Sequence, residues 1–434
     1  MDVFARITAS ERPESAAHTK TWRQVFRRAP RTFEDTKDVV LVSAYFYPEP
    51  AGSAPPITDL ARFISEKKLK AQVITARPSY PARTAFKDYR AGEHDSEDWR
   101  GIAVERLPSL ILKSTSIPAR LAAELSFAMS VLAARLKGRI SDAQSVISVC
   151  PSVLTVLSAA MVTKRGARHV AIVHDIQSGL ARSAYGAKGV AAMLKWLERV
   201  CLNRADAIVT LTPAMRDALI ANGVKRPIHV IPPQIDTHNI VPRPEPKGHF
   251  TLIYSGALGR KQGLDQLLDL AQALKATHTE AQLIIRGEGG DEVYLRKTIE
   301  QRSLHNVRLE ALVPNSKLCE AYGEGHVHLV PQNAAGADFA VPSKLFSIMS
   351  AGRPFIATAL PGSPLDQIAQ QSSGGLVVPP HDTGAFVSAV QTLQQDAALR
   401  AKLGQAGRRY AETHLDRRIL CPRILDVALP ERRL

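Results

Sequence analysis

Cysteine and aromatic residues are scarce in this sequence. The chain of 434 residues has four cysteines, and aromatic residues make up 6% of it. The cysteines lie far apart, with no pair at the spacing of a metal site or a redox motif; they are Cys150, Cys201, Cys319 and Cys421. We therefore expect isolated reduced thiols in a cytosolic protein, and we assign them no chemistry.

The sequence also has little that would carry it into or across a membrane. Residues 1–37 are polar and basic and contain no apolar core of a signal peptide. The uncharged run from Ala143 to Thr163 is long enough to cross a bilayer, but Pro151 and four serines interrupt it. This run predicts a buried strand, a turn and a buried helix, so we expect a cytoplasmic protein without a transmembrane helix.

Acidic residues are too few to balance the basic ones. The formal net charge is +15, and residues 1–245 hold 35 Lys and Arg against 23 Asp and Glu, while the remainder holds 21 against 18. A basic first half indicates an anionic partner, such as anionic lipid or a phosphorylated substrate, although basicity can also serve solubility alone. Nucleic acid is not expected, because zinc-finger spacings and basic runs interleaved with aromatic residues are both missing.

The length and the alternation of apolar runs predict two α/β domains. Residues 1–37 are interpreted as a flexible basic tail and residues 38–236 as the first domain, which opens with the apolar run Val39–Ser43, a loop rich in Pro and Gly, and a helical pattern from Ile57 to Leu69. About six parallel strands are expected. The later strand candidates are Gln72–Thr75, Ala103–Arg106, Val146–Val149, His169–Val173, Ala207–Leu211 and His229–Ile231.

A proline-rich segment separates the two halves. Pro242, Pro244 and Pro246 lie within residues 237–248, which we predict to be the interdomain linker. Residues 249–415 show a second alternation of strands and helices, and residues 416–434 are expected to pack back on the first domain. The sequence thus predicts two Rossmann-like, doubly wound domains that face each other across a cleft, where a ligand would bind.

One motif of the second domain combines a helix start with a cation. Pro342-Ser343-Lys344-Leu345 opens a predicted helix, with Ser343 as its N-cap. Free backbone N–H groups and the helix dipole attract an anion there, and Lys344 adds a full charge, so a diphosphate would be held well. An ordinary capped helix with a surface lysine is the alternative.

Two glycine-containing loops should lie on the same rim. The first, residues 256–263, follows the first strand of the second domain, and the second ends the next strand. Glycine lets the backbone approach a ligand, while arginine and lysine could neutralise phosphate oxygens; a plain tight turn is the alternative for the second loop. The candidates are Gly256, Gly259, Arg260, Lys261, Gly287, Glu288 and Gly289.

The first domain offers two candidates for reacting groups. His174 and Asp175 directly follow the expected strand of residues 171–173. His174 could exchange a proton with a substrate hydroxyl, and Asp175 could orient that hydroxyl or act as a base, although a histidine bonded to local backbone fits equally well. No Asp-x-Asp pair ends a strand, so no metal is assigned, and cationic groups would carry the charge of a diphosphate.

Residues 116–139 combine an apolar pattern with basic residues. An apolar helix face edged by arginines can lie on an anionic membrane, and a core helix with solvated ends is the alternative. The residues concerned are Leu121, Leu125, Phe127, Met129, Val131, Leu132 and Leu136, with Arg120, Arg135, Lys137 and Arg139.

Several short motifs lie between Asp38 and Leu415. They are Tyr47–Pro55, Arg77–Pro81, Leu211-Thr212, Ile231–Pro233, Gly287–Gly289 and Pro342-Ser343-Lys344 through Gly352-Arg353-Pro354. Together they resemble the family-4 glycosyltransferases of the GT-B fold, particularly bacterial enzymes of capsule, exopolysaccharide and colanic-acid assembly. They indicate the family but do not specify a particular substrate.

The resemblance implies retaining transfer of a sugar from a nucleoside diphosphate sugar, without a further cofactor. The acceptor would be a saccharide, expected to be polyprenyl-linked, with peripheral contact at the inner face of an anionic membrane. Lys344, with Arg260 or Lys261, would match the positions that stabilise the leaving diphosphate. Donor contacts would come from Gly52, Ser53, Pro342, Ser343, Leu345 and Ser347, base contacts from Leu312 and Val313, and acceptor contacts from Tyr80, Arg83 and His174.

The chain departs from the family pattern at three positions. Many relatives carry two glutamates where this chain has Phe339 and Ser347, and an arginine where it has Ala257. A non-catalytic relative that binds nucleotide sugars is therefore an alternative, as is a nucleotide-sugar epimerase of similar architecture. A nicotinamide-dependent dehydrogenase is disfavoured, because the glycine fingerprint after the first strand is missing.

Overall fold

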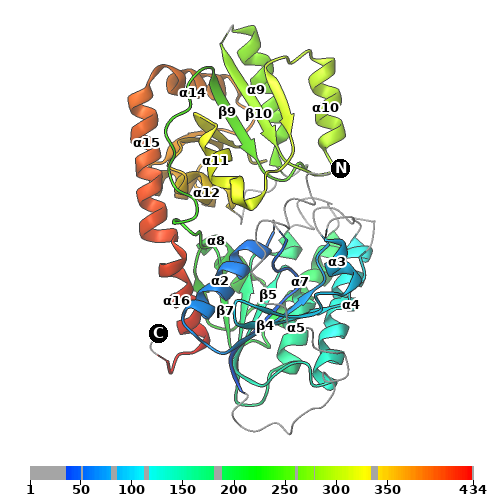
Figure 1. The fold of residues 1–434 in the computed structure, drawn as a ribbon. Helices are drawn as coiled ribbons and strands as arrows, with labels where there is room; N and C mark the ends of the chain where they lie inside the picture. The colour runs from blue at the N-terminus through cyan, green and yellow to red at the C-terminus, as the bar shows by residue number, and fades with distance from the viewer. Residues whose placement is uncertain are drawn as a thin grey trace.

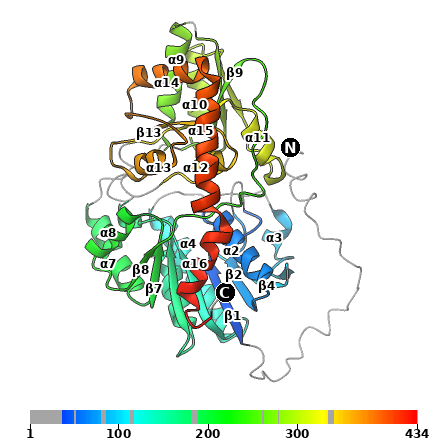
Figure 2. The ribbon, with the colours of Figure 1, turned by 90° about the vertical axis from the view of Figure 1, so that its left-hand side faces the viewer.

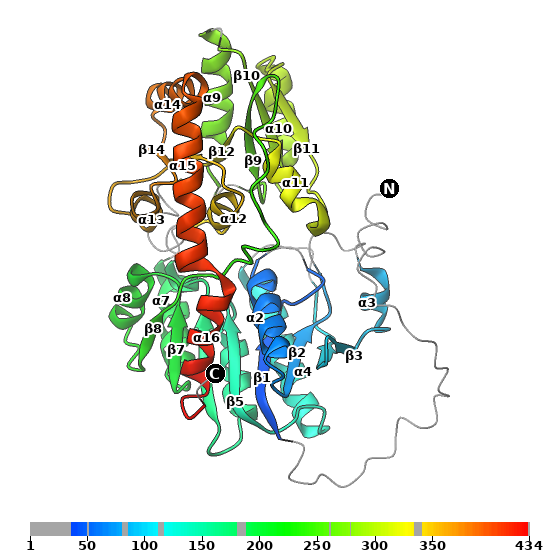
Figure 3. The same cartoon turned by 60° about the vertical axis from the view of Figure 1, so that its left-hand side comes forward.

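Two β-sheets, one in each half of the chain and both mainly parallel, form the framework of the protein (Figure 1). The structure is a computed structural model that describes residues 36–49, 52–79, 86–111, 117–179, 188–259, 262–277, 279–333 and 341–432. Helices cover both faces of each sheet, and the two α/β domains lie end to end (Figures 1 and 3). The predicted class, two doubly wound Rossmann-like domains, is confirmed.

The first sheet has eight strands in the order β3-β4-β2-β1-β5-β6-β7-β8. All neighbouring strands are parallel except β3, which pairs antiparallel with β4 at the edge. The sequence analysis missed β3 because Ser-Glu-Asp-Trp carries no apolar alternation. The strands are β1 (Lys37–Ser43), β2 (Ala71–Ala76), β3 (Ser96–Trp99), β4 (Ile102–Leu107), β5 (Ala143–Cys150), β6 (Arg168–Val173), β7 (Ala207–Thr210) and β8 (Ile228–Val230).

The helices of the first domain form two layers around this sheet. Helix α2 (Ala54–Glu66) packs on one face together with α16 (Arg417–Ala428), the last helix of the chain. The other face is covered by three neighbouring helices, α4 (Ile117–Leu136), α5 (Val153–Val162) and α7 (Lys188–Leu202). Two shorter helices complete the domain, α3 (Lys87–Ala91) and α8 (Pro213–Ala221).

The second sheet has six parallel strands in the order β11-β10-β9-β12-β13-β14. Its strands are β9 (Phe250–Ser255), β10 (Ala281–Arg286), β11 (Val307–Glu310), β12 (Val327–Val330), β13 (Phe355–Thr358) and β14 (Gly375–Val378). Its helices are α9 (Leu264–Ala276), α10 (Glu292–Gln301), α11 (Leu318–Gly323), α12 (Lys344–Ser350), α13 (Pro364–Ser372), α14 (Thr383–Gln395) and α15 (Ala397–Tyr410). A single 3₁₀ turn over Asn315–Lys317 leads directly into α11. Across the described ranges of both domains, every helix is too short or too polar to span a bilayer.

The C-terminal part of the chain runs from the second domain onto the first (Figures 2 and 3). Helix α15 passes into a π-helical turn over Ala411–Leu415, and Asp416 then caps α16 by accepting a hydrogen bond from the Arg418 N–H (2.8 Å). Burial opposes ionisation of Asp416, but hydrogen bonds from Arg418 and Thr237 outweigh it and lower the pKa of this carboxyl to about 2. A charged Asp416 therefore fixes the point where the helix changes direction.

The linker and this C-terminal segment cross between the domains next to each other. The backbone N–H of Ile235 donates to Leu415 O (2.9 Å), and the Arg417 N–H donates to Ile235 O (2.9 Å). Arg408 donates to the carbonyl oxygens of Thr237 (2.9 Å) and Ile240 (2.7 Å) in the linker. The two crossings thus form one hydrogen-bonded unit.

The docking of α16 contributes directly to the core of the first domain. Leu420 is fully buried there, whereas the adjacent Ile419 is 39% exposed. Leu420→Ala should lower the free energy of unfolding by about 2–5 kcal/mol, because a cavity remains in a packed core. Ile419→Ala, the matched control in the same helix, should cost less than about 1 kcal/mol. Urea unfolding followed by circular dichroism measures both, and equal losses would show that α16 does not rely on this contact.

Candidate functional site

Lys344 lies at the carboxyl edge of the second sheet, folded onto the loop that follows β9. Its Nζ is 3.8 Å from the centroid of the Tyr254 ring and 3.3 Å from Gln262 Oε1. The Tyr254 hydroxyl donates to Ala257 O (2.7 Å), which holds the ring beneath the ammonium. Gly256 leaves the necessary space, because a Cβ at this position would lie 2.8 Å from Lys344 Nζ. The loop and the lysine therefore form one structural unit.

The side chain of Lys344 is half-buried, and its ammonium lacks a compensating negative charge. Among the residues that the structure describes, no carboxylate forms an ion pair with it, and its contacts are an aromatic face and an amide oxygen. Burial alone lowers the pKa of Lys344 to about 7. A perturbed cation without a counter-charge is typical of a site that receives an anionic ligand.

The two glycine loops pack against each other at the ends of β9 and β10. The N–H of Leu258 donates to Glu288 O (2.9 Å). A Cβ at Gly287 would lie 2.0 Å from Gly256 O, and one at Gly289 would lie 2.2 Å from Leu258 O. Packing between loops therefore explains Gly287 and Gly289 without a ligand, whereas nothing lies within 4 Å of a Cβ at Gly259.

The start of α12 differs from the prediction. Ser343 occupies the N-cap position, but its backbone is helical (φ −58°, ψ −26°) and its side chain makes no capping hydrogen bond. A capping side chain usually needs an extended backbone to reach the N–H groups of the first turn. A tight turn replaces the cap, with Leu345 N–H donating to Pro342 O (3.0 Å). The prediction of Ser343 as a side-chain cap was wrong.

Other predicted positions of the second domain have distinct surroundings. Leu345 is fully buried in the hydrophobic core, so its side chain serves packing. Ser347 forms a side-chain hydrogen bond with Tyr322. Leu312 and Val313 follow β11 and are half-buried, and Glu288 is half-buried as well, with its pKa raised by burial and by Glu292. Tyr80, Arg83, Arg260, Lys261 and Phe339 lie outside the described residues.

The first-domain candidates lie at the carboxyl edge of the other sheet. Gly52 is exposed with a positive φ (+67°), and Ser53 is buried at the start of α2. The backbone of Asp175 accepts a weak hydrogen bond from Cys150 Sγ (3.9 Å). The structure therefore divides the predicted residues into two groups, one on each of two facing domains (Figure 1).

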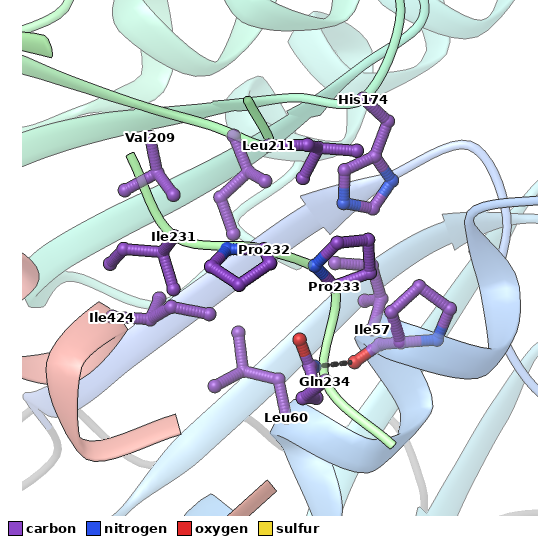
Figure 4. Close-up of a pocket in the computed structure, with 12 residues that line it drawn as sticks. Ile57, Leu60, His174, Val209, Leu211, Ile231, Pro232, Pro233, Gln234 and Ile424 are labelled. Atoms are coloured by element: carbon purple, nitrogen blue, oxygen red, sulfur yellow. Dashed lines mark hydrogen bonds between the residues drawn. The ribbon is translucent and has the colours of Figure 1, made fainter. Parts of the chain in front are cut away.

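His174 borders a small apolar pocket beside the linker (Figure 4). Its imidazole lies near Leu211 and Pro233 in this view, and further walls come from α2 and α16. Burial lowers the pKa of His174 to about 4, so the ring is neutral at physiological pH. A neutral imidazole can position a hydroxyl by hydrogen bonding, but it is a weak proton acceptor.

A polar cluster at the same edge was missed by the sequence analysis. Glu124 Oε1 accepts hydrogen bonds from Gln177 Nε2 (3.0 Å) and Arg120 Nε (3.2 Å), and burial raises the pKa of Glu124. Desolvation raises the pKa of Tyr45, and the nearby carboxylates of Glu49 and Glu124 raise it further. One signal was available in the sequence, because Glu124 is the single acidic residue of a helix whose other residues are apolar, serine or arginine.

The contact between the glycine loops can be tested by adding one methyl group. Gly287→Ala places a Cβ against the Gly256 carbonyl and should cost about 1–3 kcal/mol of stability, since the backbone must move. Gly290→Ala is the matched control, because nothing lies within 4 Å of its Cβ. Thermal unfolding compares the two variants, and an unchanged melting temperature for Gly287→Ala would contradict the packing described above.

Two family models match the chain, one for each domain. The model described as a glycosyl transferase 4-like domain matches residues 51–234, and the model described as glycosyl transferases group 1 matches residues 237–410. Together they account for most of the 434 residues.

Curated relatives point the same way. A protein of Escherichia coli K12 named as a colanic acid biosynthesis glycosyl transferase, WcaI, is 28% identical over 404 residues, which is 87% of this chain and 96% of that protein. The alpha-D-kanosaminyltransferase of Streptomyces kanamyceticus is 24% identical over 225 residues, covering 49% of this chain and 57% of that protein.

Solved structures share the fold. Sucrose-phosphate synthase from Thermosynechococcus elongatus superposes with a TM-score of 0.71 at 16% identity, over 90% of this chain and 98% of that one. HepE from Anabaena, solved with UDP and glucose, gives 0.66 at 14% identity over 90% and 98%. WaaG, a glycosyltransferase involved in lipopolysaccharide biosynthesis, gives 0.64 at 15% identity over 90% and 99%. With both domain models matched, the chain belongs to the group 1 glycosyltransferases and is a glycosyltransferase of the GT-B fold.

Proposed function

We propose that this glycosyltransferase moves a sugar, with retention of configuration, from a nucleoside diphosphate sugar to a lipid-linked saccharide in exopolysaccharide or other cell-surface polysaccharide assembly. The observation that carries the proposal is the partly desolvated ammonium of Lys344, which has no carboxylate partner among the described residues. A diphosphate supplies the missing negative charge. The name of the Escherichia coli relative supports the polysaccharide context, and the UDP in the HepE structure supports the donor class.

In the proposed donor site, the diphosphate lies beside Lys344 at the loop after β9. Gly256 and Gly259 let the backbone approach the phosphates, and Arg260 and Lys261, which follow Gly259 in the sequence, add positive charge. Gln262 and Tyr254 hold the ammonium in position before the ligand arrives. Preorganised charge of this kind stabilises a departing diphosphate more than it stabilises the intact donor.

The nucleoside would occupy the neighbouring part of the second domain. The backbone at Leu312 and Val313 follows β11 and would lie beside the base. Ser347 stands where many relatives carry a glutamate, and its hydroxyl is engaged with Tyr322. We infer that ribose recognition in this chain relies less on a carboxylate than it does in those relatives.

In the proposed reaction, the bond between the sugar anomeric carbon and the diphosphate oxygen breaks while the acceptor hydroxyl forms a bond to the same carbon on the same face. The hydroxyl proton passes to the departing phosphate, which leaves as a nucleoside diphosphate. His174 is neutral and Asp175 adjoins it, so both act as positioning groups for the acceptor. Gly52 and Ser53 would close over the donor phosphates from the first domain.

Replacing the cation tests the donor site. Lys344→Ala should lower turnover by about 10²–10³-fold, because charge developing on the diphosphate loses its nearest stabiliser. Lys297→Ala is the control, since Lys297 is an exposed lysine on α10 of the same domain. The assay measures release of nucleoside diphosphate and transfer to a saccharide acceptor over a panel of nucleotide sugars, and normal turnover by Lys344→Ala would contradict the proposal.

The products separate this proposal from its rivals. An epimerase would convert the donor without any acceptor, whereas a transferase gives a glycosylated acceptor and one nucleoside diphosphate. Binding without turnover of any donor would instead indicate a non-catalytic relative, which the residues Ser347 and Ala257 left open.

The lowered pKa of Lys344 predicts that donor binding takes up a proton. Above pH 7 the free site holds a largely neutral amine, and a bound diphosphate favours the charged form and so raises the pKa. Calorimetric titration with UDP at pH 8, in buffers of different ionisation enthalpy, should show uptake of a fraction of one proton and an affinity that falls as pH rises. Lys344→Met should show neither effect. If the wild type took up no proton on binding UDP, Lys344 would be excluded as the diphosphate ligand.

A further inference from the structure

The segment of residues 174–179, which follows β6, carries both candidates for the acceptor side of the reaction, His174 and Asp175. The backbone N–H of His174 donates to Cys150 O (3.1 Å) at the end of β5. Among the described residues, however, no hydrogen bond restrains the His174 imidazole, which lies beside Leu211 and Pro233 (Figure 4). The place of the imidazole therefore follows from the place of the backbone that carries it.

A carboxylate of α7 holds the far end of the 174–179 segment. Glu198 is 2% exposed, and it accepts hydrogen bonds from the backbone N–H of Ser178 (2.9 Å) and from the Ser178 hydroxyl. The backbone N–H of Gln177 donates to the same carboxylate. The amide nitrogen of Asn222, at the end of α8, lies 3.5 Å from Glu198 Oε2. Several donors of two adjacent residues thus converge on one buried side chain.

A second carboxylate holds the same segment from α4. Glu124 Oε1 accepts a hydrogen bond from Gln177 Nε2 (3.0 Å), and this amide also donates to Pro151 O at the turn before α5. Gln177 is 5% exposed, so its side chain is enclosed by these contacts. Gln177 is therefore fixed twice, through its backbone from α7 and through its side chain from α4.

Stability alone does not account well for the two carboxylates. Among the described residues Glu198 forms no ion pair, and burial raises its pKa although the hydrogen bonds from the segment lower it. Burial also raises the pKa of Glu124, against the opposing charge of Arg120. A raised pKa means that the fold disfavours the charged form relative to water. What each carboxylate provides instead is a set of acceptor atoms with a fixed direction, which selects one position for the segment.

We propose that Glu198 and Glu124 are positioning residues, which fix the 174–179 segment and so the place where its reactive groups meet an acceptor hydroxyl. They act through this segment alone and leave donor binding unchanged, because the proposed donor site lies in the other domain. A loosened segment would misplace His174, and a displacement of about 1 Å can cost about 10²-fold in rate. The contact with an acceptor rests on the proposed function, whereas the restraint of the imidazole does not.

Histidine-selective NMR tests the restraint without any donor or acceptor. In protein with isotope-labelled histidine, the His174 signal is assigned by its loss in His174→Gln. Glu198→Gln keeps the side-chain volume but replaces one acceptor oxygen with a donor, so the His174 signal should shift or broaden. Asp206→Asn is the matched control, because Asp206 accepts the backbone N–H of His169 (2.8 Å) at the opposite end of β6. It should leave the His174 signal in place.

Kinetics tests the acceptor role, with the donor and acceptor that the panel of nucleotide sugars identifies. Glu198→Gln should lower kcat/KM for the acceptor by about tenfold or more, while KM for the donor stays within about twofold of the wild type. Glu124→Gln should change the same parameters in the same direction. Ser178→Ala removes only one donor and serves if Glu198→Gln does not fold. The double variant should be no worse than Glu198→Gln alone, because both changes affect one contact.

The outcomes separate this proposal from a purely structural role and from the proposed function. An unmoved His174 signal in Glu198→Gln would overturn the proposal, whatever the enzyme turns over. A moved signal with unchanged kcat/KM for the acceptor would also overturn it, as would equal losses for donor and acceptor, which indicate general damage to the fold. If the wild type transferred no sugar from any donor, the proposed function would fail, and the NMR comparison would still decide whether the carboxylates restrain His174.

Discussion

The hydrogen bonds between the two chain crossings decide which surfaces of the domains face each other. Arg408 ties the second domain to the linker carbonyls, and the Arg417 side chain joins Asp236 (3.0 Å) to Glu66 (2.9 Å) on α2. Because these contacts lie where the chain crosses between the domains, they constrain both domains at once. This hydrogen-bonded unit therefore sets the relative placement of the carboxyl edges of both sheets and of the candidate groups on them.

Lys344 sits at one of these edges with its charge only partly compensated. The Tyr254 ring and the Gln262 amide favour the ammonium, and burial disfavours it, so the group titrates near neutrality. A carboxylate beside Lys344 would stabilise the ammonium in the empty site, but it would also repel a phosphate. The structure therefore keeps at this position an unfavourable interaction that an anionic ligand can relieve, as is common at binding sites.

The sequence predicted the positions of the loops better than the contacts that their residues make. Glycine after β9 and β10 was correctly placed at the sheet edge, but Gly287 and Gly289 face a neighbouring loop, a contact between segments about thirty residues apart. Ser343 has the right chemistry for a cap, yet the turn at Pro342 sets a helical backbone that prevents it. The cluster around Glu124 joins residues from separate elements, and no local sequence pattern predicts such a contact.

The apolar runs and their spacing determined by themselves that this chain forms parallel α/β domains, because strand and helix periodicities are local properties of the sequence. The family motifs likewise needed no coordinates. Only the tertiary structure decided that the Lys344 ammonium lies half-buried over the Tyr254 ring, that His174 is desolvated, and that α4 presents one apolar face to the core and another to solvent. Burial and electrostatic surroundings depend on which distant segments pack together, and that information is not contained in any single stretch of residues.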